Sequence, residues 1–376
     1  MLARLWALAC GSLLACSTTP SVDGGASDAA RDAGPTDAAA SLLDGSALDS
    51  SGPGLDAEPE DAAAEDTGAP ADATCSPTGR VTLPADDSVH ASAPIEWWYW
   101  TGHLQTDDGK WLGFEEVFFR VVQFGFSVQF AHHALTDVSA GTFHYAEERA
   151  FSAPRAVPNG FELVLGPISA SGGDGHDVLH AEVDGKKLDL TLEATDAPVL
   201  QHGDGYTDYA FGGNTYYYSR ERMTAEGTLT TTTASVRVRG SAWFDHQWGE
   251  IQTAITAGWD WFALQLDDGR EVMIFVVRVD GEDVLVGGSV STEECGQLDI
   301  GPDDFSLTPT GTWASSDGCT YPAGWDLTVN GETFVITPVL ADQELKTLLQ
   351  RYWEGAAEVS GASTGRAYVE LTGYCR

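Results

Sequence analysis

The carboxylate of Asp245 lies between two nearby tryptophans in the sequence. Asp245 lies two residues after Trp243 and three residues before Trp248. A carboxylic acid held among apolar side chains has a raised pKa, so it can stay protonated and act as a general acid. Aromatic faces beside it can stabilise a cation through the ring quadrupole. These residue types therefore favour chemistry that begins with proton transfer and passes through a positively charged species.

The neighbouring His246 is a second candidate catalytic residue, because a nearby imidazole can order a water molecule. Successive side chains of a strand point to opposite faces. Trp243 and Asp245 would therefore share one face, and His246 and Trp248 the other. Only one of Asp245 and His246 should face the interior of the fold, and we favour Asp245. The alternative is that Asp245 makes a buried hydrogen bond that locks a domain junction.

Further aromatic and acidic residues are candidates for lining the same cavity. Glu96 precedes Trp98 and Trp100 in one aromatic run, and Tyr217 lies in a run of three tyrosines. An exposed carboxylate at a strand end and ordinary aromatic core packing are the alternatives. The predicted substrate-binding residues are Glu96, Trp98, Trp100, Tyr217, Trp243 and Trp248.

Two adjacent acids interrupt an apolar segment, residues 111–120. One of Glu115 and Glu116 must face inward if this segment has a buried face, and a buried Glu usually pairs with Arg. Arg220 and Arg222 are the candidate partners.

The histidines do not form a recognisable metal motif. The pattern H-E-x-x-H does not occur. His132 and His133 would alternate faces of a strand, and His176 and His180 lie in a segment rich in Gly and Asp. No Gly-rich dinucleotide fingerprint follows a predicted strand. We therefore expect no metal ion and no cofactor.

The segments that position these residues have the pattern of β-strands. From residue 95 onward, apolar runs alternate with turn signals such as Asp184-Gly185 and Asn330-Gly331. Such pairs between β-rich runs predict tight hairpins. Residues 342–353 are the exception, because their leucines and Trp353 recur at helical spacing. The sequence predicts an all-β fold of barrels or sandwiches with one short C-terminal helix.

The chain also contains an internal repeat. Trp98-Tyr99-Trp100 is followed by Leu-Gln and then by Asp-Asp-Gly, and Trp259-Asp260-Trp261 is followed by the same two patterns. Chance similarity of two hairpins is the alternative. We favour two barrel-like halves and predict the boundaries 1–16, 17–75, 76–250 and 251–376.

Three motifs carry a family resemblance: residues 96–104 (EWWYWTGHL), residues 240–249 (GSAWFDHQWG), and residues 352–356 (YWEGA) with 371–374 (LTGY). They resemble the AttH/CrtC family, which includes hydroxyneurosporene synthase (carotenoid 1,2-hydratase) and predicted secreted hydrolases. The resemblance spans residues 85–376 and implies two lipocalin-like antiparallel β-barrel domains. For the hydratase members it implies addition of water to an isoprenoid double bond without a cofactor, whereas many relatives have no known activity.

The N-terminus is predicted to be an export and anchoring signal. Residues 1–16 hold Arg4, an apolar stretch too short to span a bilayer, and Leu13-Leu14-Ala15-Cys16, which resembles the bacterial lipobox. We expect lipidation of Cys16 and anchoring in the bacterial cell envelope, in the outer membrane because Ser17 is not acidic. An ordinary signal peptide is the alternative. The low-complexity residues 17–75 are predicted to be a disordered linker.

Four cysteines remain for the folded part: Cys75, Cys295, Cys319 and Cys375. An exported chain with four cysteines is expected to form two disulfides, in one of three pairings. Cys295 can pair locally with Cys319, which would leave Cys75 to join Cys375.

The net charge of the chain limits which kinds of molecule it can bind. The chain has 19 Lys and Arg against 57 Asp and Glu, a net charge of −38, which argues against nucleic acid because phosphate binding needs a basic surface. We expect a monomer that binds a hydrophobic small molecule and meets the membrane through its anchor. A cofactor-independent hydratase, a non-catalytic carrier and a structural lipoprotein with filled barrels remain open. A cavity with an inward carboxylate would favour the first.

Overall fold

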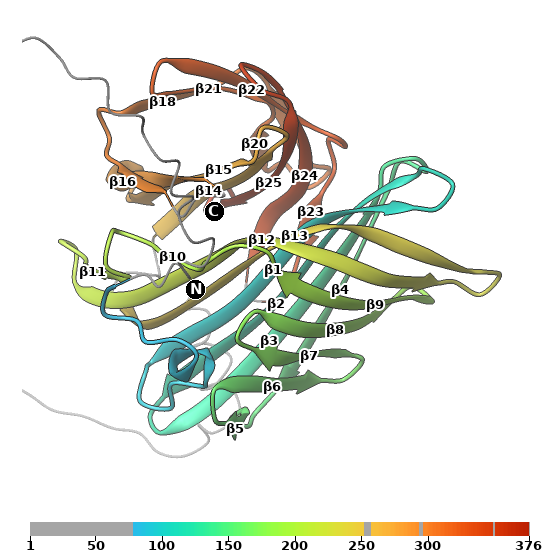
Figure 1. Ribbon diagram of the computed structural model, residues 1–376, viewed down its shortest axis with the longest axis horizontal. Coiled ribbons are helices and arrows are strands. Elements are labelled where there is room, and N and C mark those ends of the chain that lie inside the picture. Colours follow the sequence, from blue (N-terminus) through green and yellow to red (C-terminus); the bar gives the residue numbers. More distant parts are fainter. Residues whose placement is uncertain (1–77, 252–256, 293–295, 349, 376) are drawn as a thin grey trace, which may run out of the picture. The chain divides into compact units, whose positions relative to one another are not determined.

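Most residues that the structure describes lie in antiparallel β-strands or in the turns between them (Figure 1). This computed structural model describes residues 78–251, 257–292, 296–348 and 350–375. Within these residues the helical structure is limited to the 3-10 turn η1 (Ala85–Asp87), and no helix there is long and apolar enough to cross a membrane. The all-β prediction is confirmed, whereas Cys16 and the predicted linker lie outside the described residues.

The first sheet, sheet A, follows the order β4-β3-β2-β1-β13-β12-β9-β8-β7-β6-β5, with β10 and β11 beside β12. Its strands are β1 (Ile95–Thr106), β2 (Trp111–Gln123), β3 (Phe126–Asp137), β4 (Thr142–Ala150), β5 (Arg155–Val157), β6 (Gly160–Leu165), β7 (Ile168–Gly173), β8 (His176–Val183), β9 (Lys186–Ala194), β10 (Val199–Leu200), β11 (Tyr206–Asp208), β12 (Gly213–Thr230) and β13 (Ser235–Ile251). Sheet A curls until β3 and β4 contact β6 to β8 across its interior. That interior is filled by a core that includes Trp98, Phe161 and Leu190.

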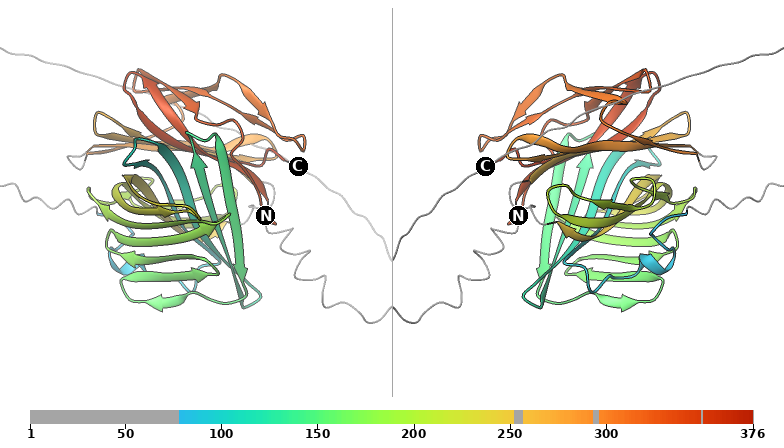
Figure 2. Two further views of the ribbon diagram at one scale, coloured as in Figure 1. Left: turned by 90° about the vertical axis from the view of Figure 1, so that its right-hand side faces the viewer. Right: turned by 90° about the vertical axis from the view of Figure 1, so that its left-hand side faces the viewer.

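The second sheet, sheet B, follows the order β17-β16-β15-β14-β25-β24-β22-β21-β18, with β23 beside β24. Its strands are β14 (Ala257–Leu266), β15 (Arg270–Val279), β16 (Glu282–Thr292), β17 (Gln297–Ile300), β18 (Phe305–Pro309), β21 (Trp325–Val329), β22 (Glu332–Pro338), β23 (Glu344–Lys346), β24 (Arg351–Gly361) and β25 (Gly365–Thr372). It curls around its own core, which includes Phe262, Trp325 and Phe334, as the two side views in Figure 2 show. A separate small hairpin joins β19 (Thr312–Ala314) to β20 (Thr320–Pro322).

The two sheets share one topology. Each begins with a meander of four strands, and the last strand of each sheet pairs with its first, β13 with β1 and β25 with β14. The repeated Trp-x-Trp motifs lie in the two first strands, and the Asp-Asp-Gly repeats lie in the turns that follow them. Two curled, barrel-like halves therefore exist as predicted.

The strands between the two cores are buried on both faces. β8 meets solvent on one face, and its burial alternates along the strand, whereas β1 is buried almost throughout. One face of β1 belongs to the core of sheet A. The other packs on sheet B through a third cluster, which includes Tyr99, Trp243, Trp261 and Tyr368. A strand buried on both faces lacks a regular alternation of polar and apolar residues, as the aromatic run of residues 97–100 in β1 illustrates.

The predicted helix over residues 342–353 is wrong. The segment instead forms β23 and the start of β24, with Glu344 opposite Trp353. Leu345 is fully buried while Leu348 is 44 % exposed, so these two leucines do not share a buried face. The strand conformation wins because β24 also pairs with β22 and β25, and such tertiary pairing overrides local helical periodicity.

Of the three cysteine pairings left open by the sequence, the structure excludes the one in which Cys295 pairs locally with Cys319. Cys319 is bonded to Cys375, with a Cα–Cα distance of 5.1 Å, so Cys319 does not pair with Cys295 and Cys375 does not pair with Cys75. The small hairpin that carries Cys319 packs against the C-terminal segment, where Tyr321 and Tyr374 are in ring contact. Cys75 and Cys295 lie outside the described residues.

Candidate functional site

A cavity of about 170 Å³ lies between sheets A and B rather than inside either barrel. Its wall is largely aromatic and aliphatic, and four carboxyl groups interrupt it: Glu115, Asp245, Glu354 and Glu370. The apolar and aromatic lining residues are Ile95, Trp97, Tyr99, Val117, Phe119, Tyr209, Phe211, Tyr217, Ile251, Trp259, Trp261, Phe275, Val277, Leu285 and Tyr352. No Lys or Arg is among the described residues that line it. A concave, mostly apolar site with a few convergent polar groups is typical of small-molecule binding.

Strand register explains why these side chains meet. Tyr99 lies opposite Val117 of β2 and opposite Asp245 of β13, so all three point to the same face of sheet A. Glu115 lies two residues before Val117 and therefore shares that face. Glu354 and Glu370 lie opposite each other on β24 and β25 of sheet B.

Asp245 is buried and accepts three hydrogen bonds. The donors are the hydroxyl of Tyr217 at 2.7 Å, the hydroxyl of Ser219 at 2.6 Å, and Nε1 of Trp243 at 2.7 Å. Burial raises the pKa of Asp245 to about 6, and the three hydrogen bonds oppose that rise. All three donors belong to sheet A, so these bonds fix the carboxylate within its own sheet and do not cross to sheet B.

Glu354 is the carboxyl group of sheet B that bonds across the cavity. Its Oε1 accepts a hydrogen bond from the Tyr99 hydroxyl at 2.7 Å, and its Oε2 has no partner among the described residues. Burial, together with the nearby carboxyl groups of Glu370 and Glu115, raises its pKa well above the usual range. Burial raises the pKa of Glu370 to about 7, against a hydrogen bond from Trp259. Burial and the neighbouring carboxyl groups therefore favour the protonated form of Glu354.

The expected arginine partner of the inward-facing Glu is absent from the described residues. Glu115 faces the cavity, and neither of its oxygens has a partner there. Arg220 pairs with Asp87, and Arg222 pairs with Glu271, so the prediction of an Arg220 or Arg222 partner is wrong. Burial raises the pKa of Glu115 well above normal, which favours the neutral form, and a neutral carboxyl group needs no counter-ion.

The predicted site residues divide between two faces of sheet A. Asp245 and Tyr217 line the cavity. Trp243 lies on the same face, where it bonds Asp245 and packs edge-on against Trp261 of sheet B, but it does not line the cavity. The remaining predicted residues lie on the opposite face, inside sheet A: Glu96, Trp98, Trp100, His246 and Trp248.

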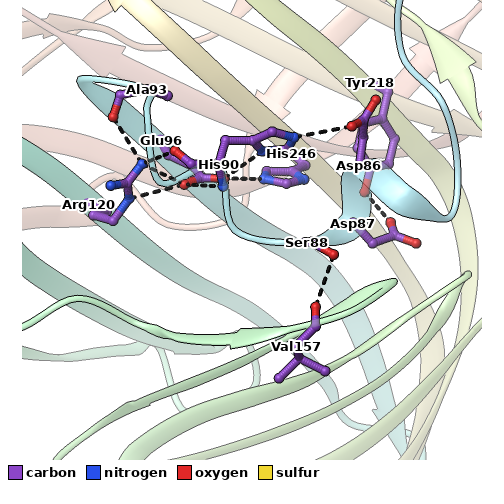
Figure 3. A network of polar contacts seen from close by, with 10 residues as sticks. All are labelled: Asp86, Asp87, Ser88, His90, Ala93, Glu96, Arg120, Val157, Tyr218 and His246. Carbon is purple, nitrogen blue, oxygen red and sulfur yellow. Dashed lines mark hydrogen bonds and ion pairs between the residues drawn. The ribbon is translucent and has the colours of Figure 1, made fainter.

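Glu96 and His246 belong to a polar network in the interior of sheet A (Figure 3). Oε1 of Glu96 lies 2.9 Å from Nδ1 of His90 and 3.1 Å from Nε2 of His246, and Oε2 lies 2.9 Å from the Arg120 guanidinium. Burial would raise the pKa of Glu96, but the hydrogen bonds from His246 and His90 lower it to about 2. The network ties the segment before β1 to β2 and β13.

Two groups of side chains have metal-ligand chemistry. Ligand atoms of His90, Glu96 and His246 lie within 4.8 Å of one another, as do those of Cys319, Glu344 and Cys375. In the first group both oxygens of Glu96 already accept hydrogen bonds, one of them from Arg120. In the second group the two cysteines are bonded to each other.

The sequence reasoning assigned no role to Glu354 or Glu370. Glu354 lies within a motif that carried the family resemblance, between a tryptophan and three small residues, and Glu370 lies between Val369 and Leu371. An acid whose immediate neighbours in a strand are apolar or small was the available signal, because such a residue is rarely buried without a reason.

Comparison with known proteins finds one family and a set of similar folds. A profile of the family described as AttH-like matches residues 74–374. The crystal structure of an AttH protein from Nitrosomonas europaea is 28% identical with a TM-score of 0.73, and the match covers 80% of this chain and 100% of that one. Kievitone hydratase from Nectria haematococca is 19% identical with a TM-score of 0.65, covering 80% of this chain and 96% of that one. None of the curated proteins compared matches the sequence.

Proposed function

The chain belongs to the AttH-like family, and from this premise we propose that it binds a hydrophobic small molecule between its two sheets and adds water to a carbon–carbon double bond. The observation that carries the proposal is a largely apolar, aromatic cavity that holds buried carboxyl groups with raised pKa, with no Lys or Arg among the described residues that line it. The family resemblance implies an isoprenoid-like substrate, and the similar fold of kievitone hydratase supports a hydratase over other enzymes.

Glu354 is the proton donor in this proposal. The Tyr99 hydroxyl holds Oε1, which leaves Oε2 free to carry a proton towards the ligand. A carboxyl group that is neutral at pH 7 is a competent general acid. Asp245 is less suited to this role than we expected from the sequence, because its three donors favour the ionised form.

Asp245 is the base. Transfer of the Glu354 proton to one alkene carbon leaves a carbocation on the other and a carboxylate on Glu354. Water attacks the cation, and the proton that it loses passes to Asp245. Return of that proton to Glu354 through water restores both groups, so the net reaction adds one water molecule. Aromatic faces in the wall, such as those of Trp97 and Trp261, stabilise the cation.

The setting of this activity is the cell envelope. In this proposal Cys16 carries acyl chains that anchor the protein in the outer membrane, as the Leu13–Cys16 pattern supports. More than one chain is needed for stable anchoring. A lipid-rich setting also suits a substrate that is sparingly soluble in water.

A non-catalytic carrier would use the same cavity, so the decisive experiment must measure chemistry as well as binding. The full chain is purified, and bound small molecules are identified by mass spectrometry. The recovered ligand is then incubated with protein in oxygen-18-labelled water. A hydratase incorporates one labelled oxygen, whereas a carrier returns the ligand unchanged.

Glu354→Gln tests the assignment of the proton donor. The amide keeps the shape and the Tyr99 hydrogen bond but loses the acid, so incorporation should fall by about 10²-fold or more. Glu116→Gln is the matched control, since Glu116 is also buried and lies outside the cavity. Equal incorporation by the two variants would rule out Glu354 as the donor.

A further inference from the structure

The most exposed large apolar residues of the described chain gather at one end of sheet A. Phe124 is 79% exposed, Phe126 is 74% exposed and Phe151 is 80% exposed. Phe124 forms the turn between β2 and β3, Phe126 begins β3, and Phe151 directly follows β4, the strand that pairs with β3. This end lies toward the bottom of Figure 1. The Gln129 side chain bonds Ser152 at 2.9 Å, which holds the segment of Phe151 beside β3.

The backbone conformation of the turn between β2 and β3 does not favour a phenylalanine at position 124. Gln123 pairs with Phe126, and Phe124 and Gly125 both have positive φ, at 52° and 79°. A two-residue turn of this kind favours Asn-Gly or Asp-Gly, because a bulky residue is strained at positive φ. Four other two-residue hairpins in the described part of the chain follow that rule: Asp174-Gly175, Asp184-Gly185, Asp280-Gly281 and Asn330-Gly331.

Charge also distinguishes this end from the rest of the molecule. Residues 121–136 and 149–161 contain no Asp or Glu, although the chain as a whole carries 57. The second segment contributes the exposed residues Arg149 and Arg155, the latter paired with Glu162 on β6. Exposed aromatic rings in segments that contain arginine but no acid match the boundary between lipid tails and phosphate headgroups.

We propose that the end of sheet A formed by Phe124, Phe126 and Phe151 docks into the surface of a phospholipid bilayer. A phenylalanine side chain presents roughly 150–250 Å², so the three expose about 350–550 Å² in total. A stable protein interface takes about 800 Å² from each partner, so this surface is small for a second copy or a protein partner. Three protruding rings can insert between headgroups without a complementary partner surface.

Docking brings the proposed cavity close to lipid. Phe119 lines the cavity and lies five residues before Phe124, so the cavity wall reaches within about 17 Å of the inserted turn. A hydrophobic substrate can then pass between bilayer and cavity over a short path. This supply route rests on the proposed function, whereas the docking itself does not.

The test is binding of the full chain to phospholipid vesicles. The chain carries Cys16→Ser, so that no acyl chain contributes, and the vesicles contain phosphatidylcholine with phosphatidylglycerol and no other ligand. The protein should co-sediment with the vesicles. Phe124→Asn should lower the partition coefficient by at least about tenfold, which corresponds to roughly 1.4 kcal/mol. Asn suits the positive φ of this turn, so the thermal unfolding temperature should not fall.

Leu298→Asn is the matched control, because Leu298 is 54% exposed but lies on β17 of sheet B. It should bind vesicles as the parent chain does. Absence of vesicle binding, or equal binding by the two variants, would overturn the proposal. So would a dimer in sedimentation velocity that Phe124→Asn dissociates without any change in vesicle binding. Since no turnover is measured, failure here is distinct from failure of the proposed hydration.

Discussion

Replacement of Asp245 by Asn should change how the stability of the protein depends on pH. Burial raises the pKa of Asp245 from 3.8 to about 6 in the folded protein. The folded state therefore keeps its proton at pH values where the unfolded chain has lost it. Stability from this group is fully present below pH 3.8 and is lost as pH rises towards 6. Asp245→Asn removes this loss.

The expected change in folding stability follows from the size of the pKa shift of Asp245. A difference of about 2 pKa units corresponds to about 3 kcal/mol over the whole transition. Roughly 1.4 kcal/mol of this falls between about pH 5 and pH 8, both above the isoelectric point near 4.2. The Asn amide also leaves one of the three donors poorly paired, at a cost of about 1–3 kcal/mol that does not depend on pH. Comparison of the free energies of unfolding at the two pH values separates the contribution that depends on pH from the one that does not.

The assay is urea unfolding of the parent protein and of Asp245→Asn at both pH values. The difference in stability, variant minus parent, should be about 1.4 kcal/mol larger at pH 8 than at pH 5, because only the parent loses stability as pH rises. Glu282→Gln, which removes a carboxyl group at an exposed hairpin end, serves as the control. If the Asp245→Asn difference did not vary with pH, or varied in the opposite direction, the three hydrogen bonds would outweigh burial and our reasoning would fail.

Three further predictions concern the anchor, the disulfide and the contact between the sheets. Cys16→Ser should move the protein from the membrane fraction to the soluble fraction or block its processing, and unchanged fractionation would contradict lipidation. Cys319→Ser should lower the free energy of unfolding by about 2–4 kcal/mol, and thiol labelling of the denatured, unreduced parent should leave Cys319 and Cys375 unmodified. Gly113→Ala should destabilise the fold by about 1–3 kcal/mol in denaturant unfolding, because its new methyl group would overpack the contact between the sheets. The new Cβ atom at position 113 would lie 2.7 Å from Cβ of Ala356. Gly109→Ala is not a suitable control, because its Cβ would meet no atom within 4 Å but its φ of 84° is strained for alanine. Gly113→Ala is therefore compared with the parent protein.

The strands and turns were predictable because their signals are local. Asp-Gly and Asn-Gly pairs mark hairpins wherever the neighbouring residues favour strands, and the structure has turns at Asp184-Gly185 and Asn330-Gly331. The helix predicted at residues 342–353 failed for the complementary reason. Its spacing was a local pattern, whereas pairing of β24 with β22 and β25 depends on residues distant from β23 in the chain.

The candidate site was predictable only in part. Alternation correctly separates Asp245 from His246, since the first lines the cavity and the second lies inside sheet A. The same rule also separates Tyr99 from Glu96, Trp98 and Trp100, yet we grouped the latter three with Asp245. Strand register sets the grouping, because Tyr99 is the residue opposite Asp245. Register is a relation between two strands, so neither sequence contains it alone.

The sequence by itself determines the all-β class, the repeated halves, the family and which side chains share a face of each strand. These follow from patterns with a period of two residues and from turn chemistry that acts over a few residues. Tertiary structure alone decides which face of β1 and β13 meets a cavity, because both faces are buried and both carry aromatic and polar side chains. It also brings Glu354 and Glu370 of one sheet beside Asp245 and Glu115 of the other, and it joins Cys319 to Cys375. Packing between the two curled sheets makes these contacts, and no local periodicity encodes how two separate sheets meet.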